Sequence, residues 1–227
     1  MLIELGVIPL SHRRAFDAEL SDLKRDILRM ASLVEQSIFN ALEALLKQDP
    51  LIARDVITGD DAIDRMRYET ENRCIRLIAT QQPMARDLRV IVTGIKILIN
   101  LERMGDHAVD IARAAMCVCG RMPAKPLEKI PRMARLVQHM VKDGMDAYVH
   151  GDVEKARQMC LMDDDVDEIY NLTFQDLITY MEENPHTIPC VVYLLMVARH
   201  LERLADRATN IGEEVIYLVT GEWKELN

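Results

Sequence analysis

Apolar residues recur roughly every three to four positions along almost the whole chain, which is the spacing of one buried helix face. Short segments containing Asp, Gly or Pro interrupt this pattern and divide it into six long helices. We expect these helices at residues 11–48, 50–81, 84–120, from the next connector to about 150, at 152–183 and at 189–220. The 227-residue chain holds only nine glycines and eight prolines, which disfavours strand-and-turn architectures. The predicted fold class is therefore all-α.

The interruptions carry recognisable helix-end signals. Asp49 and Pro50 suit the N-cap and first position of the second helix. Gly151 and Asp152 suit the end of the fourth helix and the cap of the fifth. Residues 120–126 form a proline-rich connector, G-R-M-P-A-K-P, between the halves. We therefore expect two domains, a three-helix bundle at 1–121 and another at 122–227.

The second half of the chain repeats the first. The segment N-L-E-R-M-G-D-H-A-V-D-I-A at 100–112 recurs as H-L-E-R-L-A-D-R-A-T-N-I-G at 200–212, and D-D-A-I-D at 60–64 recurs as D-D-D-V-D at 163–167. The offset falls from 103 residues in the second motif to 100 in the first, and the loop before the last helix can absorb the difference. Such an internal repeat indicates a duplicated unit.

The repeat places acidic residues in stripes along the helices. At about 100° per residue, Asp106 lies about 40° and Asp110 about 80° from Glu102, whereas Leu101 and Met104 lie on the opposite side. The corresponding stripes hold Glu202, Asp206 and Asn210 on the last helix, Asp60 and Asp64 on the second, and Asp163 and Asp167 on the fifth. We expect these stripes to face away from the core, into solvent.

Two interpretations of the stripes compete. Charged residues on the outside of a helix are normal, so one E-x-x-x-D alone would indicate a solvated face. However, like charges at i and i+4 cost about 0.2–0.5 kcal/mol per pair, and a bound multivalent cation would turn that repulsion into coordination. The donors are all oxygen and lack the Glu-x-x-His of di-iron bundles, so Mg²⁺, Mn²⁺ or ferric iron fits better than zinc. His107, beside the stripe, is expected to be an ordinary surface histidine.

Charge and composition exclude several classes. A net charge of −9 argues against a nucleic-acid ligand. No apolar run approaches the ~20 residues of a membrane span, and no signal peptide is evident. Five cysteines without framework spacing indicate reduced thiols and a cytoplasmic protein. Acids on an exposed face lack the pocket and raised pKa of catalytic pairs, so we do not expect an enzyme.

Two motifs resemble the PhoU family of phosphate-uptake regulators. They are Q-P-M-A-R-D-L-R-V-I at 82–91 followed by L-E-R-M-G-D at 101–106, and the second copy L-E-R-L-A-D-R-A-T-N-I at 201–211. The resemblance covers nearly the whole chain and implies two three-helix bundles related by a pseudo-twofold axis. It also implies multinuclear metal clusters on the protein surface, of iron in some members, and iron is the metal expected here. One cluster would lie on Glu102, Asp106, Asp110, Asp60 and Asp64, and the other on Glu202, Asp206, Asn210, Asp163 and Asp167.

The resemblance further implies a cytoplasmic, homodimeric accessory protein that restrains the high-affinity phosphate transporter and phosphate-starvation signalling. Its implied partners are the transporter's ATP-binding subunit and a phosphate-sensing histidine kinase, so it would meet the membrane only through them. Asn210 in place of an acid predicts two unequal metal sites, and Asp87 and Arg89 have no counterpart in the second half. Two alternatives stay open: a metal-independent scaffold whose acidic faces dock basic partners, and a carboxylate-bridged metal enzyme.

Overall fold

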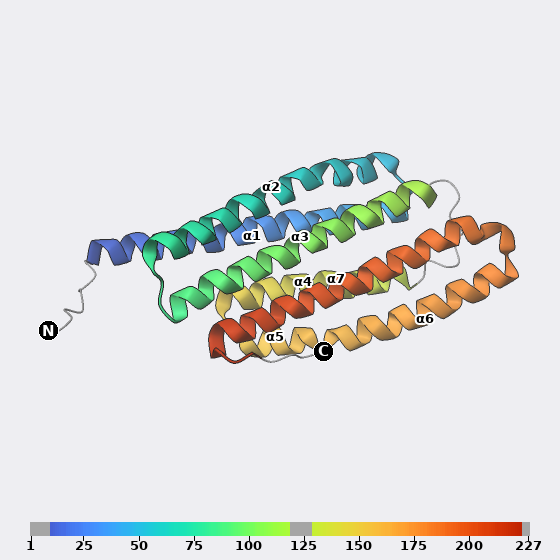
Figure 1. Cartoon of the computed structure of the whole chain (residues 1–227). Coiled ribbons are helices and arrows are strands. Elements are labelled where there is room, and N and C mark those ends of the chain that lie inside the picture. Colours follow the sequence, from blue (N-terminus) through green and yellow to red (C-terminus); the bar gives the residue numbers. More distant parts are fainter. Residues whose placement is uncertain (1–9, 119–128, 224–227) are drawn as a thin grey trace.

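The structure is a computed structural model that describes residues 10–118 and 129–223, and every regular element in these ranges is a helix. The helices form an elongated bundle (Figure 1). The first half contains α1 (Leu10–Lys47), α2 (Pro50–Gln81) and α3 (Arg86–Val118). The second contains α4 (Ile130–His150), α5 (Val153–Cys160), α6 (Met162–Glu183), the short 3₁₀ helix η2 (Pro185–Thr187) and α7 (Ile188–Thr220). The all-α prediction is confirmed.

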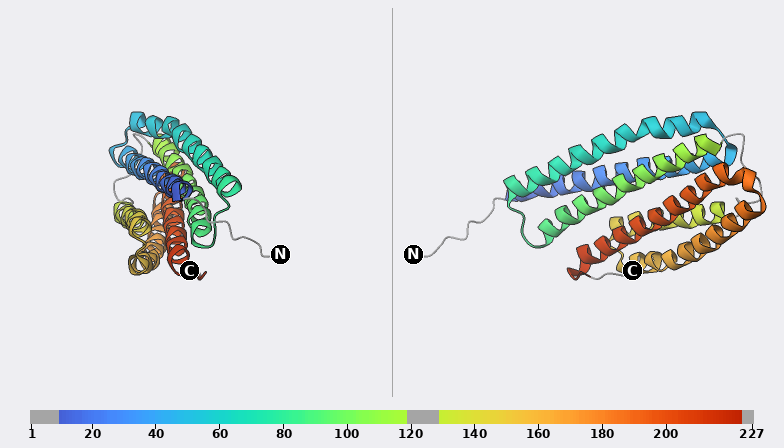
Figure 2. Two further views of the ribbon diagram at one scale, coloured as in Figure 1. Left: turned by 90° about the vertical axis from the view of Figure 1, so that its left-hand side faces the viewer. Right: turned by 45° about the vertical axis from the view of Figure 1, so that its right-hand side comes forward.

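Each half packs as its own bundle, and the two halves meet along α3 and α7. Helices α1, α2 and α3 contact one another, and α4, α5 and α6 all contact α7. α3 and α7 run antiparallel through the middle of the molecule, with α1 touching α4 behind them (Figures 1 and 2). This is the predicted pair of three-helix bundles, with α5 and α6 together filling the place of one helix. The predicted boundary at 121–122 lies outside the described residues.

The local end signals act as the sequence predicts. The Asp49 carboxylate accepts a hydrogen bond from the backbone N–H of Leu51 at 2.8 Å, with Pro50 at the first helical position. Gly151 ends α4 in the left-handed region, at φ 63°, and the Asp152 carboxylate then accepts from the N–H of Lys155 at 3.0 Å. These bonds satisfy backbone groups that a helix end otherwise leaves without partners.

Two boundaries differ from the prediction. The helix expected at 152–183 is interrupted at Leu161, and α6 then begins with Met162 and the acidic run Asp163–Asp164–Asp165. The helix expected from residue 84 begins at Arg86, because Gln82 and Ala85 adopt positive φ on either side of Pro83. Proline lacks the N–H that would have continued α2.

The core is built from the predicted apolar faces. Leu101, Met104 and Ala108 of α3 and their counterparts on α7 are fully buried. Small residues let the helices approach closely: Gly212 of α7 lies against α5, where an added Cβ would come within 2.7 Å of the Cys160 Sγ. No helix within the described ranges is both long and apolar enough to cross a membrane.

Candidate metal centres between the helices

The first acidic group lies where α2 packs along α3. Asp60 of α2 points at Gly105 of α3, and its Oδ1 lies 3.3 Å from the position that a Cβ on Gly105 would occupy. Glycine therefore leaves room for this carboxylate. The pKa of Asp60 is raised to about 6, first by burial and then by the charges of Asp64, Asp106 and Glu102. The four predicted acids of this group thus act on one another across two helices.

The second half repeats this arrangement between α6 and α7. Asp163 is 8% exposed, and its pKa is raised to about 7, first by burial and then by Asp167, Asp206 and Glu202. Burial and Asp206 also raise the pKa of Glu202. The structure therefore brings together four predicted acids in each half, and both groups combine acids of two helices.

The expectation that these acids point into open solvent holds for Asp64 and Asp167, which are exposed, but is wrong for the others. The side chains of Glu102 and Glu202 are only 19% and 13% exposed. The reason is that α2 lies over the acidic stripe of α3 and α6 over that of α7, so each pair of stripes faces inward to a shared seam. The expectation that the acids lack raised pKa values fails for Asp60, Glu102, Asp163, Asp167 and Glu202, in each case first because of burial.

The second group contains buried oxygens without partners. Asp163 Oδ1 and Glu202 Oε2 are buried and accept no hydrogen bond from any described residue, while the other Glu202 oxygen pairs with Arg199. Buried polar atoms are almost always satisfied, so each exception needs an explanation. Two unpartnered carboxylate oxygens in one seam fit a hard cation.

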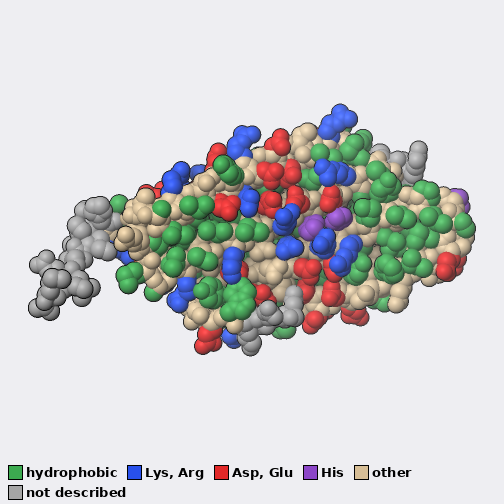
Figure 3. Space-filling model, viewed as in Figure 1, with side chains coloured by type: hydrophobic (Ala, Val, Ile, Leu, Met, Phe, Trp, Pro, Cys, Tyr) green, Lys and Arg blue, Asp and Glu red, His purple; other side chains and the backbone are tan. Residues whose placement is uncertain are grey.

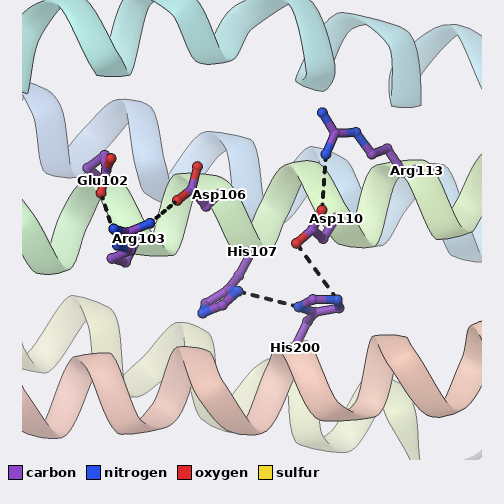
Figure 4. Close-up of polar contacts among 7 residues, drawn as sticks. All are labelled: Glu102, Arg103, Asp106, His107, Asp110, Arg113 and His200. Carbon is purple, nitrogen blue, oxygen red and sulfur yellow. Dashed lines mark hydrogen bonds and ion pairs between the residues drawn. The ribbon is translucent and has the colours of Figure 1, made fainter.

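The carboxylates of each group are nevertheless spread apart. Among the described residues, no three acids of either group bring ligand oxygens within 4.8 Å of one another. Arg103 lies between two acids of the first group, 3.5 Å from Glu102 and 3.0 Å from Asp106 (Figure 4). Mutual repulsion and this arginine keep the group open, so bound ions would have to draw the carboxylates inward.

The last predicted residue of each set lies at the edge of its group. Asp110 pairs with Arg113 at 3.2 Å and points toward His200, whose Nε2 lies 3.9 Å from the carboxylate (Figure 4). Asn210 is half-buried at the matching position of α7. Asp110 is thus oriented toward the seam between α3 and α7, whereas Asp60 and Asp106 belong to the seam between α2 and α3.

The histidine that was expected on the surface is buried between the two bundles. His107 of α3 is 8% exposed, and its Nδ1 lies 3.3 Å from the Nδ1 of His200 on α7. Its pKa is lowered to about 4, first by burial and then by His200, Arg203 and Arg207, so the ring is neutral at physiological pH. With Asp110, the two rings form the one group of three potential metal donors within 4.8 Å in the described part of the chain.

Nothing in the sequence pattern pointed to His200. The repeat aligns His107 with Arg207 and His200 with Asn100, so the two histidines do not correspond. They meet only because α3 and α7 cross antiparallel.

A pocket of about 530 Å³ opens beside them and is lined by Asp60, Arg103, Asp106, His107, Val109, Asp110, Arg113, Arg203 and Arg207. Figure 3 shows acidic side chains above and below a central strip of basic and histidine side chains.

Asp87 and Arg89, which the second half lacks, lie away from both acidic groups. Asp87 forms an ion pair with Arg13 of α1 at 2.6 Å. The Arg89 guanidinium covers Gly221, the left-handed residue that ends α7, so closely that a Cβ there would lie 2.6 Å from it. Both residues lie in the first turn of α3, where Asp87 links it to α1 and Arg89 packs against the end of α7.

Comparison with known proteins identifies the family. A family model described as the PhoU domain matches residues 27–115 and 130–215. The phosphate-specific transport system accessory protein PhoU homolog of Clostridium acetobutylicum is 44% identical and covers 95% of this chain and 99% of its own. The homolog of the same name from Aquifex aeolicus is 43% identical over 90% of this chain and 92% of its own.

Solved structures agree. The crystal structure of PhoU from Pseudomonas aeruginosa matches with a TM-score of 0.89 at 37% identity, covering 91% of this chain and all of that one. The phosphate transport system regulatory protein PhoU from Streptococcus pneumoniae matches with a TM-score of 0.87 at 33% identity, over 93% of this chain. These relatives are named as accessory or regulatory proteins and not as enzymes, in line with the sequence prediction. The chain belongs to the PhoU family.

Proposed function

We propose that this chain is a regulatory accessory protein of phosphate-specific transport, and that metal ions on its two carboxylate groups shape its regulatory form. The observation that carries the metal part is the pair of four-carboxylate seams, each with acids raised in pKa by one another. The transport role rests on relatives of that name that align with this chain over nearly their whole length.

The proposed ligands are the ten residues that the repeat marks. Asp60, Asp64, Glu102 and Asp106 form the first site with Asp110 at its edge, and Asp163, Asp167, Glu202 and Asp206 form the second with Asn210 at its edge. Oxygen-only donors favour hard ions, so we propose iron clusters, with Mg²⁺ or Mn²⁺ as other occupants. Asn210 carries no charge, so the second site is the weaker one.

Bound ions would change the packing of the helices that carry the ligands. A cation's charge would cancel the repulsion between acids of α2 and α3, and between those of α6 and α7. The outer helices α2 and α6 would then be held more firmly on the central pair. Metal occupancy therefore offers a way to alter the outer surfaces that partners touch.

The proposed setting is the cytoplasm, with the phosphate transporter's ATP-binding subunit and a phosphate-sensing histidine kinase as partners. The absence of a membrane-crossing helix from the described ranges accords with membrane contact through those partners alone. We also propose a homodimer, which rests on the family resemblance.

A cell-based experiment tests the regulatory role. A bacterium that lacks its own PhoU protein is given this chain, and phosphate uptake and a phosphate-starvation reporter are measured in phosphate-rich medium. We expect the chain to restrain both, and the double variant Asp60→Asn/Asp163→Asn to restrain them weakly at equal protein level. Asp165→Asn, an exposed acid on α6, is the matched control. Unrestrained uptake with the unmodified, well-expressed chain would contradict the proposal.

The second candidate is a metal-independent scaffold. It is favoured by the arginines that already neutralise some of the acids, Arg103 beside Glu102 and Asp106, and Arg199 beside Glu202. In that case the double variant would restrain uptake as well as the unmodified chain. Purified metal-free protein would also bind the ATP-binding subunit with unchanged affinity, and high salt would weaken that binding.

A further inference from the structure

We propose that His107, His200 and Asp110 form a third metal site that takes a borderline divalent ion of the zinc type and ties the two bundles together. This site differs in chemistry from the carboxylate groups, because two of its three donors are imidazole nitrogens. It also differs in place, since it lies on the seam between α3 and α7 (Figure 4). It shares Asp110 with the edge of the first carboxylate group, but it does not rest on the function proposed above.

The spacing of the nitrogens suits one ion. Zinc binds histidine nitrogen at about 2.0–2.1 Å in a tetrahedral arrangement, which sets two such ligands about 3.3–3.4 Å apart. The two Nδ1 atoms of His107 and His200 lie 3.3 Å apart. Asp110 belongs to the same group, in which each residue offers one donor atom within 4.8 Å of the others. Its carboxylate lies 3.9 Å from the Nε2 of His200, so Asp110 or that ring would have to turn to bring the third ligand to the Nδ1 pair.

A hydrogen bond between the rings is the competing account of the contact. Two neutral imidazoles that meet through their Nδ1 atoms can share only one proton, and this fixes the tautomer of both rings. Whichever ring donates, the Nε2 of His107 is buried and has no hydrogen-bond partner among the described residues. A metal ion accepts both Nδ1 lone pairs at once, and the Nε2 of each ring then carries the proton.

The charges around the group permit a cation. Arg203 and Arg207 lie nearby, and neither forms an ion pair with another described residue. Their positive charge opposes a metal ion, but Asp110, Asp106 and Asp60 line the same pocket. With three protein donors, a tetrahedral ion keeps one position for water or a small anion, as catalytic zinc does.

The site exists once, unlike the duplicated acids. The repeat places Arg207, Asn210 and Asn100 where the symmetric copy would need histidine, aspartate and histidine. Two donors come from the first bundle and one from the second, so a bound ion would cross-link the bundles. Occupancy would therefore couple the two halves, which also meet through packing, the Lys96–Glu214 ion pair and the hydrogen bond from Lys24 Nζ to the Val149 carbonyl.

Copper(II) is the most informative probe, because its electron paramagnetic resonance spectrum resolves coupling to bound nitrogen. We expect one equivalent of Cu²⁺ on the full chain to show two imidazole nitrogens. The variant His107→Gln/His200→Gln should lose that coupling, and its Zn²⁺ affinity by equilibrium dialysis should fall at least about tenfold. His139→Gln, an exposed histidine on α4, is the matched control and should change neither.

Two further variants keep the test decisive. Asp110→Asn preserves both rings and should weaken Zn²⁺ binding while the nitrogen coupling stays, so it covers the case in which the double variant misfolds. Asp64→Asn/Glu102→Gln removes acids of the first carboxylate group that are not donors here and should leave the nitrogen coupling intact, which separates this proposal from that carboxylate site. A spectrum without nitrogen coupling in the unmodified chain would overturn the proposal, as would identical coupling in the histidine double variant.

Discussion

At the scale of single residues, the charge of the groups around a buried carboxylate decides whether its removal stabilises or destabilises the fold. Asp163 faces three other acids, and its charge is therefore unfavourable in the metal-free fold. Glu214 is 4% exposed and faces a cation, with its Oε1 2.9 Å from the Lys96 Nζ. The acids around Asp163 are therefore poised for a ligand, whereas Glu214 is already neutralised by Lys96.

Asp163→Asn should therefore stabilise the metal-free protein. The amide keeps the volume of the side chain and removes a charge that burial and Asp167, Asp206 and Glu202 oppose. We expect a gain on the order of 1–3 kcal/mol in the free energy of unfolding at pH 8, measured by urea denaturation in the presence of chelator. Asp165→Asn, exposed on the same helix, should change stability by less than about 0.5 kcal/mol. A clear loss of stability in Asp163→Asn would contradict the repulsion described here.

Lys96→Met should destabilise the protein, because it leaves the Glu214 charge buried without its cation. We expect a loss of about 2–4 kcal/mol at pH 8. The pKa of Glu214 is already raised, first by burial and also by Glu213, and only Lys96 lowers it. A folded pKa above the unfolded value means that the ionised form weakens the fold, so the loss should shrink as the pH falls and Glu214 takes up a proton.

The double variant Lys96→Met/Glu214→Gln is the control for that prediction. It removes both charges, so most of the lost stability should return and the pH dependence should vanish. A loss in Lys96→Met that stays constant from pH 8 to pH 4 would show that Glu214 is not its cause. Trp223, whose ring centre lies 3.8 Å from the Lys96 Nζ, contributes a smaller cation–π term to the same cluster.

At the scale of helices, two glycines test how tightly the elements pack. Gly212→Ala should cost about 1–3 kcal/mol, because its Cβ would lie 2.7 Å from both the Cys160 Sγ and the Met159 Cε of α5. Gly59→Ala on α2 meets nothing within 4 Å and should gain up to about 1 kcal/mol from helix propensity. Thermal unfolding of the two variants measures both effects, and a gain in Gly212→Ala would refute the close approach of α5 to α7.

Helix boundaries were predictable wherever a local signal sets them. Asp49, Gly151 and Asp152 end or begin helices through bonds to backbone atoms a few residues away, so the sequence alone locates those boundaries. No glycine or proline lies at the interruption at Leu161, so no local signal in the sequence predicts it. The exposure of the acidic stripes also depends on how α2 and α6 lie over the central helices, which helical periodicity does not report.

At the scale of the whole molecule, the internal repeat predicted the two bundles and the pairing of the acids. It could not predict the seam between the bundles, because residues that meet there are not equivalent in the repeat. His107 with His200 and Lys96 with Glu214 both lie on that seam. The duplication thus accounts for the two carboxylate groups. The antiparallel crossing of α3 and α7 accounts for the His107–His200 and Lys96–Glu214 contacts, which have no counterpart in the repeat.

The central claim is that each carboxylate group holds metal, and anomalous X-ray diffraction tests it most directly. Crystals of the full chain, purified without chelator and saturated with iron, are measured just above and just below the iron absorption edge. We predict anomalous peaks between α2 and α3, beside Asp60 and Asp106, and weaker peaks between α6 and α7, beside Asp163 and Asp206. Crystals that diffract well and show no iron peak in either seam would contradict the account.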